Sequence, residues 1–212
     1  AIKLVYASAY SKAAKAYIEA TSNRIEEEKM AVIVQQMVGR QYEDYDYPHF
    51  SGVGHSTNFY PMGHMDPEDG VVTVALGLGR TVVEGGKALR FSPNHPAILP
   101  QFGTVDDWLK NSQNQFFAMD LSDPLAYPGT RDDFNLAVLD LADAERHGTL
   151  EPIGSVYSSE NNTVYDGIHR AGPRLVSFAH VLKSDLFPLA EIMKLLLELG
   201  RRTMSAAVEI EF

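Results

Sequence analysis

Residues 71–85 read VVTVALGLGRTVVEG, which places a strand pattern, a glycine turn and a short helical pattern in succession. The β-branched run 71–76 predicts a buried strand. The segment Gly77-Leu78-Gly79 follows directly, and residues 80–84 suit one helical turn. Glycines at this point would let backbone N–H groups approach a ribose or a phosphate closely. A tight turn without a ligand is the alternative interpretation.

The glycine turn lacks the marks of the common phosphate-binding fingerprints. Val82 stands where a G-x-G-x-x-G pattern requires its third glycine, and the chain has no Walker-type Lys-Ser/Thr pair. The turn alone therefore does not identify a nucleotide site.

Composition excludes several classes of function. The chain has 212 residues, enough for one domain or two small lobes with a buried core. Lys plus Arg is 18 and Asp plus Glu is 28, so the net charge of −10 argues against nucleic acid as a partner. With Cys at 0, thiolate chemistry and disulfides are excluded, and a reducing, cytoplasmic location is expected. Apolar stretches fall far short of the roughly 18 residues of a membrane span, so no membrane partner is expected.

Hydrophobic patterning predicts helices and strands on both sides of residues 71–85. Residues 41–50 are expected to form an exposed hairpin, and the Pro-rich stretch 92–103 predicts a lobe boundary near 92–104. The remaining expected elements are strands at 30–39, 51–60, 86–91, 115–119, 173–180 and 206–212, and helices at 1–20, 105–110, 131–147 and 186–202.

Two acidic residues alternate in the last expected strand. Residues two apart on a strand project to one face, so Glu209 and Glu211 are predicted to lie side by side. Such a pair, set against phosphate oxygens, suits Mg²⁺, which takes hard oxygen ligands and usually only one or two carboxylates. A half-solvated strand whose polar face carries two glutamates is the alternative.

The expected strand at 30–39 ends in Gln35-Gln36-Met37-Val38. An extended backbone offers an N–H and a C=O to the edge of a flat base, and apolar side chains can cover the faces of that base. This segment could therefore bind adenine, and a core strand ending in polar residues is the alternative.

Histidines near the second expected strand suggest a different chemistry. His55, His64 and Asp66 would be the ligands of a metal hydrolase, but their spacings match no zinc signature. Solvated loop histidines are the simpler interpretation.

Taken together, four motifs resemble the nucleotide-binding domain of phosphoenolpyruvate synthase and pyruvate phosphate dikinase. They are MAVIVQQMVG at 30–39, SGV at 51–53, GLGRTVVEG at 77–85 and EIEF at 209–212. The family pattern runs V-Q-x-M-V, S-G-V-x-F-T, G-L-G-E-x-V-V-x-G and D-x-E-F in the same order. The third motif is the most specific, and the joint, ordered occurrence is stronger than any one motif.

The resemblance implies an α+β, ATP-grasp-like fold in which mixed or antiparallel sheets and packed helices form two lobes around ATP. The full-length enzymes cleave ATP to AMP and pass a phosphoryl group to a histidine on a separate swivelling domain, then to pyruvate. Those other domains and the nucleotide are the implied partners, and ATP and Mg²⁺ the implied cofactors. The carried-over site residues are Gln35, Gln36, Met37 and Val38 for adenine, Gly77, Leu78 and Gly79 near the nucleotide, and Glu209 and Glu211 for Mg²⁺.

Departures from the family pattern set the remaining expectations. Arg80 replaces a glutamate, Glu209 replaces an aspartate, and the family's upstream Lys and Arg and downstream Q-x-R element are not in this chain. Residues 1–212 are therefore expected to be a fragment of the nucleotide domain, incomplete at both ends, that binds ATP weakly or not at all in isolation. The alternative is a regulatory or interaction module that keeps the fold without catalysis, for which Arg80 is the main support.

Overall fold

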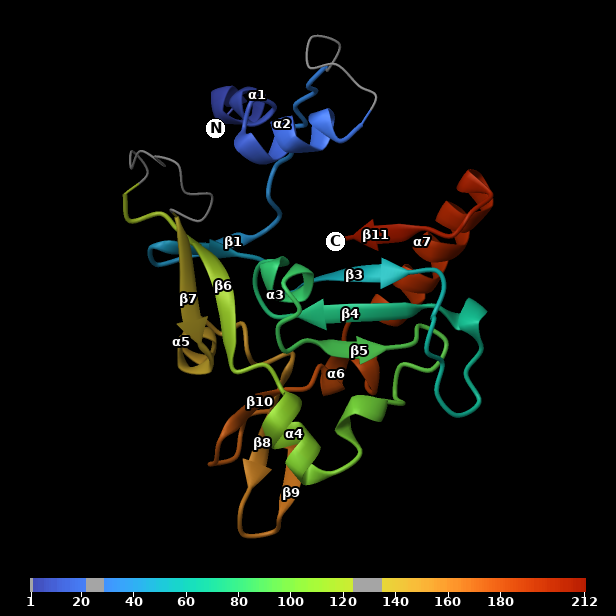
Figure 1. Ribbon diagram of the computed structural model, residues 1–212. Coiled ribbons are helices and arrows are strands. Elements are labelled where there is room, and N and C mark those ends of the chain that lie inside the picture. The colour runs from blue at the N-terminus through green and yellow to red at the C-terminus, as the bar shows by residue number, and fades with distance from the viewer. Residues whose placement is uncertain (1, 22–28, 124–134) are drawn as a thin grey trace. The chain divides into compact units, whose positions relative to one another are not determined.

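The computed structural model describes residues 2–21, 29–123 and 135–212 (Figure 1). The chain divides into two compact units, Ala1–Met37 and Val38–Phe212. Within the described residues no helix is long and apolar enough to cross a membrane.

The N-terminal unit contains two short helices, α1 (Ile2–Ser8) and α2 (Lys12–Glu19). The single helix expected at 1–20 is interrupted because Ser11 adopts an extended backbone and caps α2, its hydroxyl accepting the Ala14 N–H at 3.2 Å.

The strand expected at 30–39 is absent, and that prediction was wrong. Residues 29–39 carry no regular secondary structure, and Ile33, Val34 and Val38 are 78–84% exposed. A β-branched composition favours a strand only where a neighbouring strand completes the ladder. No described strand pairs with this segment.

The second unit contains three sheets, and every described strand pair is antiparallel. The first has the order β11 (Glu209–Glu211), β3 (Ser51–His55), β4 (Val71–Ala75), β5 (Leu89–Phe91). The second has the order β1 (Arg40–Tyr42), β2 (Tyr45–Tyr47), β6 (Gln115–Asp120), β7 (Leu136–Asp140). The third has the order β10 (Arg174–Val176), β8 (Gly154–Ser158), β9 (Thr163–Asp166).

Helices pack around these sheets, which confirms the α+β class. Figure 1 shows α3 (Arg80–Val83) in front of the first sheet and α7 (Leu189–Met204) behind it. The core joins Val72, Val74 and Phe91 of this sheet to Met193 and Leu197 of α7. The other elements are α4 (Val105–Asn111), α5 (Leu141–Arg146), α6 (Ala179–Leu182) and the 3₁₀ turns η2 (Pro67–Asp69) and η3 (Pro100–Phe102).

A second large correction concerns an expected helix. The helix predicted at 131–147 is a strand, β7, followed by the short helix α5; residues 131–134 lie outside the described part of the chain. Asp140 ends the strand and caps the helix, accepting from the Ala142 N–H at 2.8 Å and the Asp143 N–H at 3.2 Å. Leu136, Val138 and Leu139 fit either period, and pairing with β6 selects the strand.

Two other segments differ from expectation. The strand expected at 173–180 ends at Val176, because Phe178 takes a left-handed conformation (φ 52°) and α6 begins after it. The hairpin of β8 and β9 was not anticipated.

Candidate functional site

Both C-terminal glutamates lie on one face of the first sheet. In the β11–β3 pairing, Glu209 lies opposite His55 and Glu211 opposite Val53. Alternation then puts Gly52 and Gly54 on the other face, where a Cβ on Gly54 would lie 2.5 Å from Met193 Cε. The glutamates thus point away from α7 and the core, and both are exposed.

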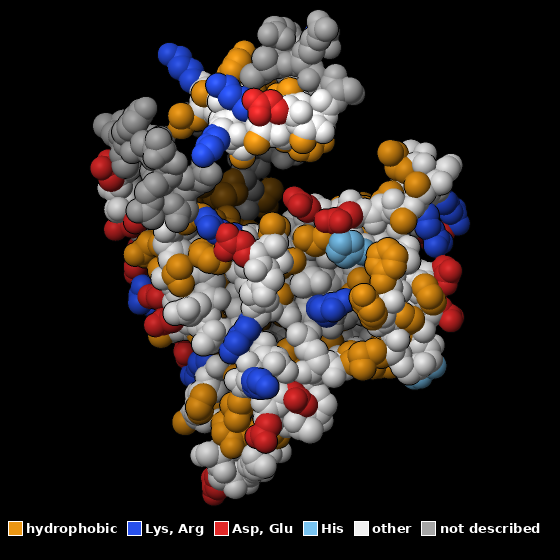
Figure 2. Space-filling model, in the orientation of Figure 1, with side chains coloured by type: hydrophobic (Ala, Val, Ile, Leu, Met, Phe, Trp, Pro, Cys, Tyr) orange, Lys and Arg blue, Asp and Glu red, His pale blue; other side chains and the backbone are white. Residues whose placement is uncertain are grey.

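His55 contacts the first of these glutamates. Its Nδ1 lies 3.4 Å from Glu209 Oε2, with the two side chains 39% and 57% exposed. Figure 2 shows acidic side chains beside a histidine over β11 and β3. The polar edge of the sheet is therefore open to a ligand.

The glycine turn lies next to the same face. The Ser51 hydroxyl donates to the Gly77 carbonyl at 2.6 Å, and a Cβ on Gly79 would lie 3.7 Å from Ser51 Oγ. Ser51 and Val53 share a face, so Ser51 is a diagonal neighbour of Glu211, at roughly 7–8 Å between such positions. The structure therefore brings the 77–79 turn and Glu211 together, one strand apart.

Packing against the second sheet explains the conformation of this turn. Gly77 has φ 81°, and a Cβ there would lie 2.7 Å from both the Phe116 ring and the Phe117 carbonyl oxygen. The Leu78 N–H donates to that carbonyl at 2.9 Å. A structural role for Gly77 is thus established, whatever the turn binds.

Arg80 does not present a free positive charge beside the turn. Its Nε lies 2.7 Å from Glu84 Oε1, one helical turn away, and its guanidinium carbon lies 5.3 Å from the centre of the Phe117 ring. Arg80 stands where the family carries a glutamate, and Glu84 balances the positive charge of Arg80.

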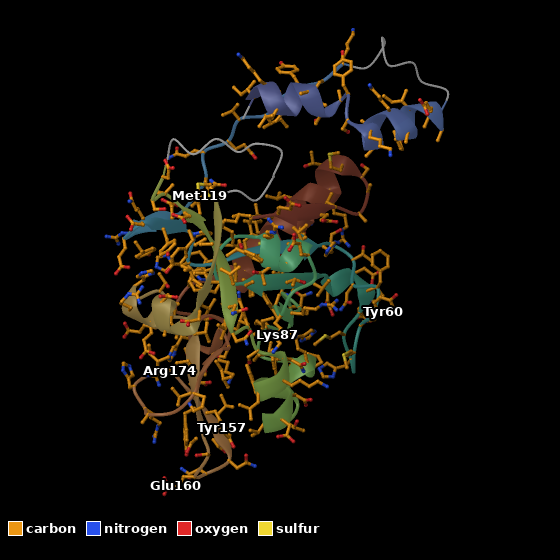
Figure 3. All side chains as sticks on the ribbon, turned by 60° about the vertical axis from the view of Figure 1, so that its left-hand side comes forward. Tyr60, Lys87, Met119, Tyr157, Glu160 and Arg174 are labelled. Atoms are coloured by element: carbon orange, nitrogen blue, oxygen red, sulfur yellow. The ribbon has the colours of Figure 1, made fainter. Side chains whose placement is uncertain are left out.

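A cavity of about 500 Å³ opens between the sheet and the segment after α3. Thr73 and Arg90, opposite each other on β4 and β5, line it together with His55 and Lys87. Figure 3 shows Lys87 between α3 and α4. Within the described residues neither Lys87 nor Arg90 has an acidic partner. Both residues are exposed, and their positive charges would favour an anionic ligand in this cavity.

Thr73, Lys87 and Arg90 stand in no motif of the sequence. A weak signal for Arg90 was present, because it is the polar position between the apolar residues Leu89 and Phe91 of a strand. The sequence around Lys87 and Thr73 carries no comparable signal, because only the folded chain brings these two residues to one cavity.

The predicted adenine-binding segment, residues 35–38, is not part of the sheet that carries the two glutamates. Gln35, Gln36 and Met37 belong to the N-terminal unit, and Val38 begins the second unit. All four are exposed and irregular. Their adenine-binding role remains a prediction.

The metal chemistry of the described residues is limited. They contain no cluster of three or more His, Cys, Asp or Glu side chains that could hold a metal ion. His64 packs edge-on against His95, with ring centres 5.6 Å apart, whereas His55 contacts Glu209. The two exposed carboxylates fit Mg²⁺ only as the minor part of a shell completed by phosphate oxygens and water.

Comparison with known proteins supports a nucleotide site. The family model described as the pyruvate phosphate dikinase AMP/ATP-binding domain matches residues 1–124. No curated protein and no solved structure matches the chain. The matched residues include three of the four motifs and exclude Glu209 and Glu211.

Proposed function

The chain belongs to the pyruvate phosphate dikinase AMP/ATP-binding domain family, and we propose that it holds Mg·ATP on the sheet face bearing Glu209 and Glu211, as part of a phosphotransferase. One observation carries this proposal. Two open carboxylates and Arg90 lie on one face of the sheet β11-β3-β4-β5, and Lys87 lines the cavity at that face together with Arg90.

The charges on this face suit the parts of a metal–triphosphate complex. Mg²⁺ bound to phosphate oxygens still accepts one or two carboxylates, which Glu209 and Glu211 supply. Lys87 and Arg90 offset the remaining negative charge of the phosphates. The metal would neutralise charge on the transferring phosphoryl group, and the residues named here bind and orient the nucleotide.

The remaining assignments follow the family. Gln35 to Val38 would contact adenine through their backbone, and Gly77, Leu78 and Gly79 would border the ribose or phosphates. In the complete enzyme the phosphoryl group would pass to a carrier histidine on another domain and then to pyruvate. The domain described here would bind and orient the ATP from which that group comes.

A second candidate is a regulatory or interaction module that keeps the fold without turning ATP over. Arg80, at the place of the family's glutamate, favours it. The Arg80–Glu84 ion pair weakens this argument, because the reversed charge is locally balanced. ATP affinity is expected whether the domain only binds ATP or also takes part in catalysis. Measuring ATP turnover by the complete enzyme distinguishes these two functions.

Isothermal titration calorimetry with ATP, MgCl₂ and both together tests the proposal. We expect Mg²⁺ to strengthen ATP binding, with a dissociation constant above about 1 μM because the site is open to solvent. MgCl₂ alone should give no heat of binding, since two carboxylates do not complete its shell. Equal affinity with and without Mg²⁺ would overturn the metal assignment.

Charge-neutral variants locate the site. Glu209→Gln with Glu211→Gln should remove the Mg²⁺-dependent gain, and Lys87→Gln should weaken ATP at least about tenfold, or about 1.4 kcal/mol. Glu160→Gln, on the exposed β8–β9 turn shown in Figure 3, and Lys110→Gln on α4 are the matched controls. ATP binding that all four variants leave unchanged would place the nucleotide elsewhere.

A further inference from the structure

A second cavity lies at the far end of the first sheet, beyond Arg90. The loop after β3, the strand β5 and the turn η3 enclose about 390 Å³, within the range of small-molecule sites. Its lining is mainly apolar and comprises Tyr60, Pro61, Met62, Met65, Val71, Phe91 and Pro100, with Asn58, Arg90, Ser92 and Gln101 as the polar members.

Hydrogen bonds hold the loop that forms the outer wall. The Asn58 N–H donates to the Pro67 carbonyl at 2.7 Å, and Asn58 Oδ1 accepts the Tyr60 N–H at 3.1 Å. The Met65 N–H donates to the Met62 carbonyl at 3.2 Å. The cavity is therefore formed before any ligand arrives, which lowers the cost of binding.

The wall presents apolar surface to water. Met65 and Phe91 are buried, but Met62 is 56% exposed and Tyr60 is 81% exposed at the outer side of the loop (Figure 3). Methionine side chains adapt to flat rings and make favourable sulfur–aromatic contacts. These walls therefore favour an aromatic ligand over a branched aliphatic one.

Arg90, an exposed residue of β5, is the charged residue of the cavity lining. The neighbouring Gln101 amide is fully engaged, its Oε1 accepting the Arg90 N–H at 2.7 Å and its Nε2 donating to the Ala88 carbonyl at 2.8 Å. The Arg90 guanidinium, in contrast, makes no ion pair with any described residue. It is thus available to an anionic group of a ligand in the cavity.

We propose that this cavity is a binding site for a small aromatic anion, with its rings against Met62, Met65 and Pro100 and its carboxylate or sulfonate on Arg90. The cavity shares Arg90 and Gln101 with the proposed nucleotide cavity, and its other lining residues are its own. Because both ligands would use the Arg90 guanidinium, the aromatic anion and the phosphates of ATP should compete for it.

Two fluorescent probes that differ in one charged group test this proposal. They are 1-anilinonaphthalene-8-sulfonate and N-phenyl-1-naphthylamine, which has the same rings without the sulfonate. We expect one saturable site for each on the folded protein without nucleotide. Arg90→Gln should weaken the sulfonate about five- to tenfold and leave the neutral probe unchanged.

A wall variant identifies the location. Met62→Glu places a charge in the apolar wall and should remove the saturable binding of both probes. Met204→Glu, on an exposed methionine of α7, is the matched control and should leave both unchanged. Circular dichroism confirms that each variant folds.

Three results would overturn the proposal: no saturable binding to the native chain, equal loss of both probes in Arg90→Gln, or unchanged binding in Met62→Glu. None of these results bears on Mg·ATP affinity, which the calorimetry measures separately.

Discussion

A buried tyrosine of the second sheet has partners for its hydroxyl group, whereas two glutamates of the first sheet are open to solvent. Tyr47 of β2 is fully buried, and its hydroxyl lies 2.8 Å from His147 Nδ1 and 3.1 Å from Thr149 Oγ1. Glu209 and Glu211 of β11 are exposed, with one histidine contact between them. Satisfied buried groups stabilise a fold, and unpaired surface charges add little to it. The Tyr47 hydroxyl therefore serves the fold, whereas the two glutamates are free to contact a ligand.

The largest expected effect is at the turn that joins the two regions. Gly77→Ala should destabilise the protein by about 2–4 kcal/mol, since it adds left-handed strain and a clash with Phe116. Gly85→Ala is the control, because Gly85 also has positive φ but no atom within 4 Å of a Cβ, and it should cost only about 1–2 kcal/mol. Urea denaturation measures both, and equal losses would contradict the packing role.

The next effect is a loss of stability in alkali. Burial raises the pKa of Tyr47 to about 12. Because the folded-state pKa is raised, its contribution is complete below about pH 10 and is lost as the pH rises through about 12. The free energy of unfolding should therefore fall by about 2–3 kcal/mol over this range. The difference in free energy of unfolding between the native chain and Tyr47→Phe, measured across this pH range, isolates the contribution of the Tyr47 hydroxyl. A difference that stays constant with pH would refute the prediction.

At neutral pH the same substitution has a smaller effect. Tyr47→Phe leaves His147 Nδ1 and Thr149 with one partner fewer and should cost about 1–3 kcal/mol. Tyr157→Phe removes an exposed hydroxyl that donates to Asn162, and should change stability by less than about 0.5 kcal/mol. Chemical denaturation at pH 7 compares the two. Similar costs would mean that the buried network is not a stabilising feature.

The smallest effect on stability is expected at the open edge. Glu209→Gln with Glu211→Gln should change the free energy of unfolding by no more than about 0.5 kcal/mol, because both carboxylates are solvated. The same variant should lose the Mg²⁺-dependent gain in ATP affinity. A large loss of stability would show that these carboxylates serve the fold.

Local patterns sufficed for part of the fold. Features that lie close together in sequence predict several elements: the period of the apolar residues and the residues at which an element ends, such as glycine. These elements are the strand at 71–75, the turn after it, the helix at 189–204 and the strand at 209–211. The family and the α+β class were recognisable for the same reason. Three of the four motifs lie in the matched residues.

Part of the candidate site was also readable, and part was not. Alternation alone put Glu209 and Glu211 on one face, and β11 confirms the strand that carries them. Lys87 and Arg90 were missed, because only the fold shows that these two cations line the same cavity. The alternating pattern that makes Arg90 polar between two core residues says nothing of what it faces.

What the sequence determined by itself is the set of local conformations: which residues turn, which alternate, and which stripe of a helix is apolar. Tertiary structure decided which strands found partners. Residues 136–140 became a strand because β6 pairs with them, while the more strongly β-branched run 30–38 has no paired neighbour among the described strands. The position of the acidic edge likewise depends on a long-range contact. The Val208 N–H donates to the Ser56 hydroxyl oxygen, 152 positions away, and only the folded chain offsets the entropy cost of bringing such distant residues together.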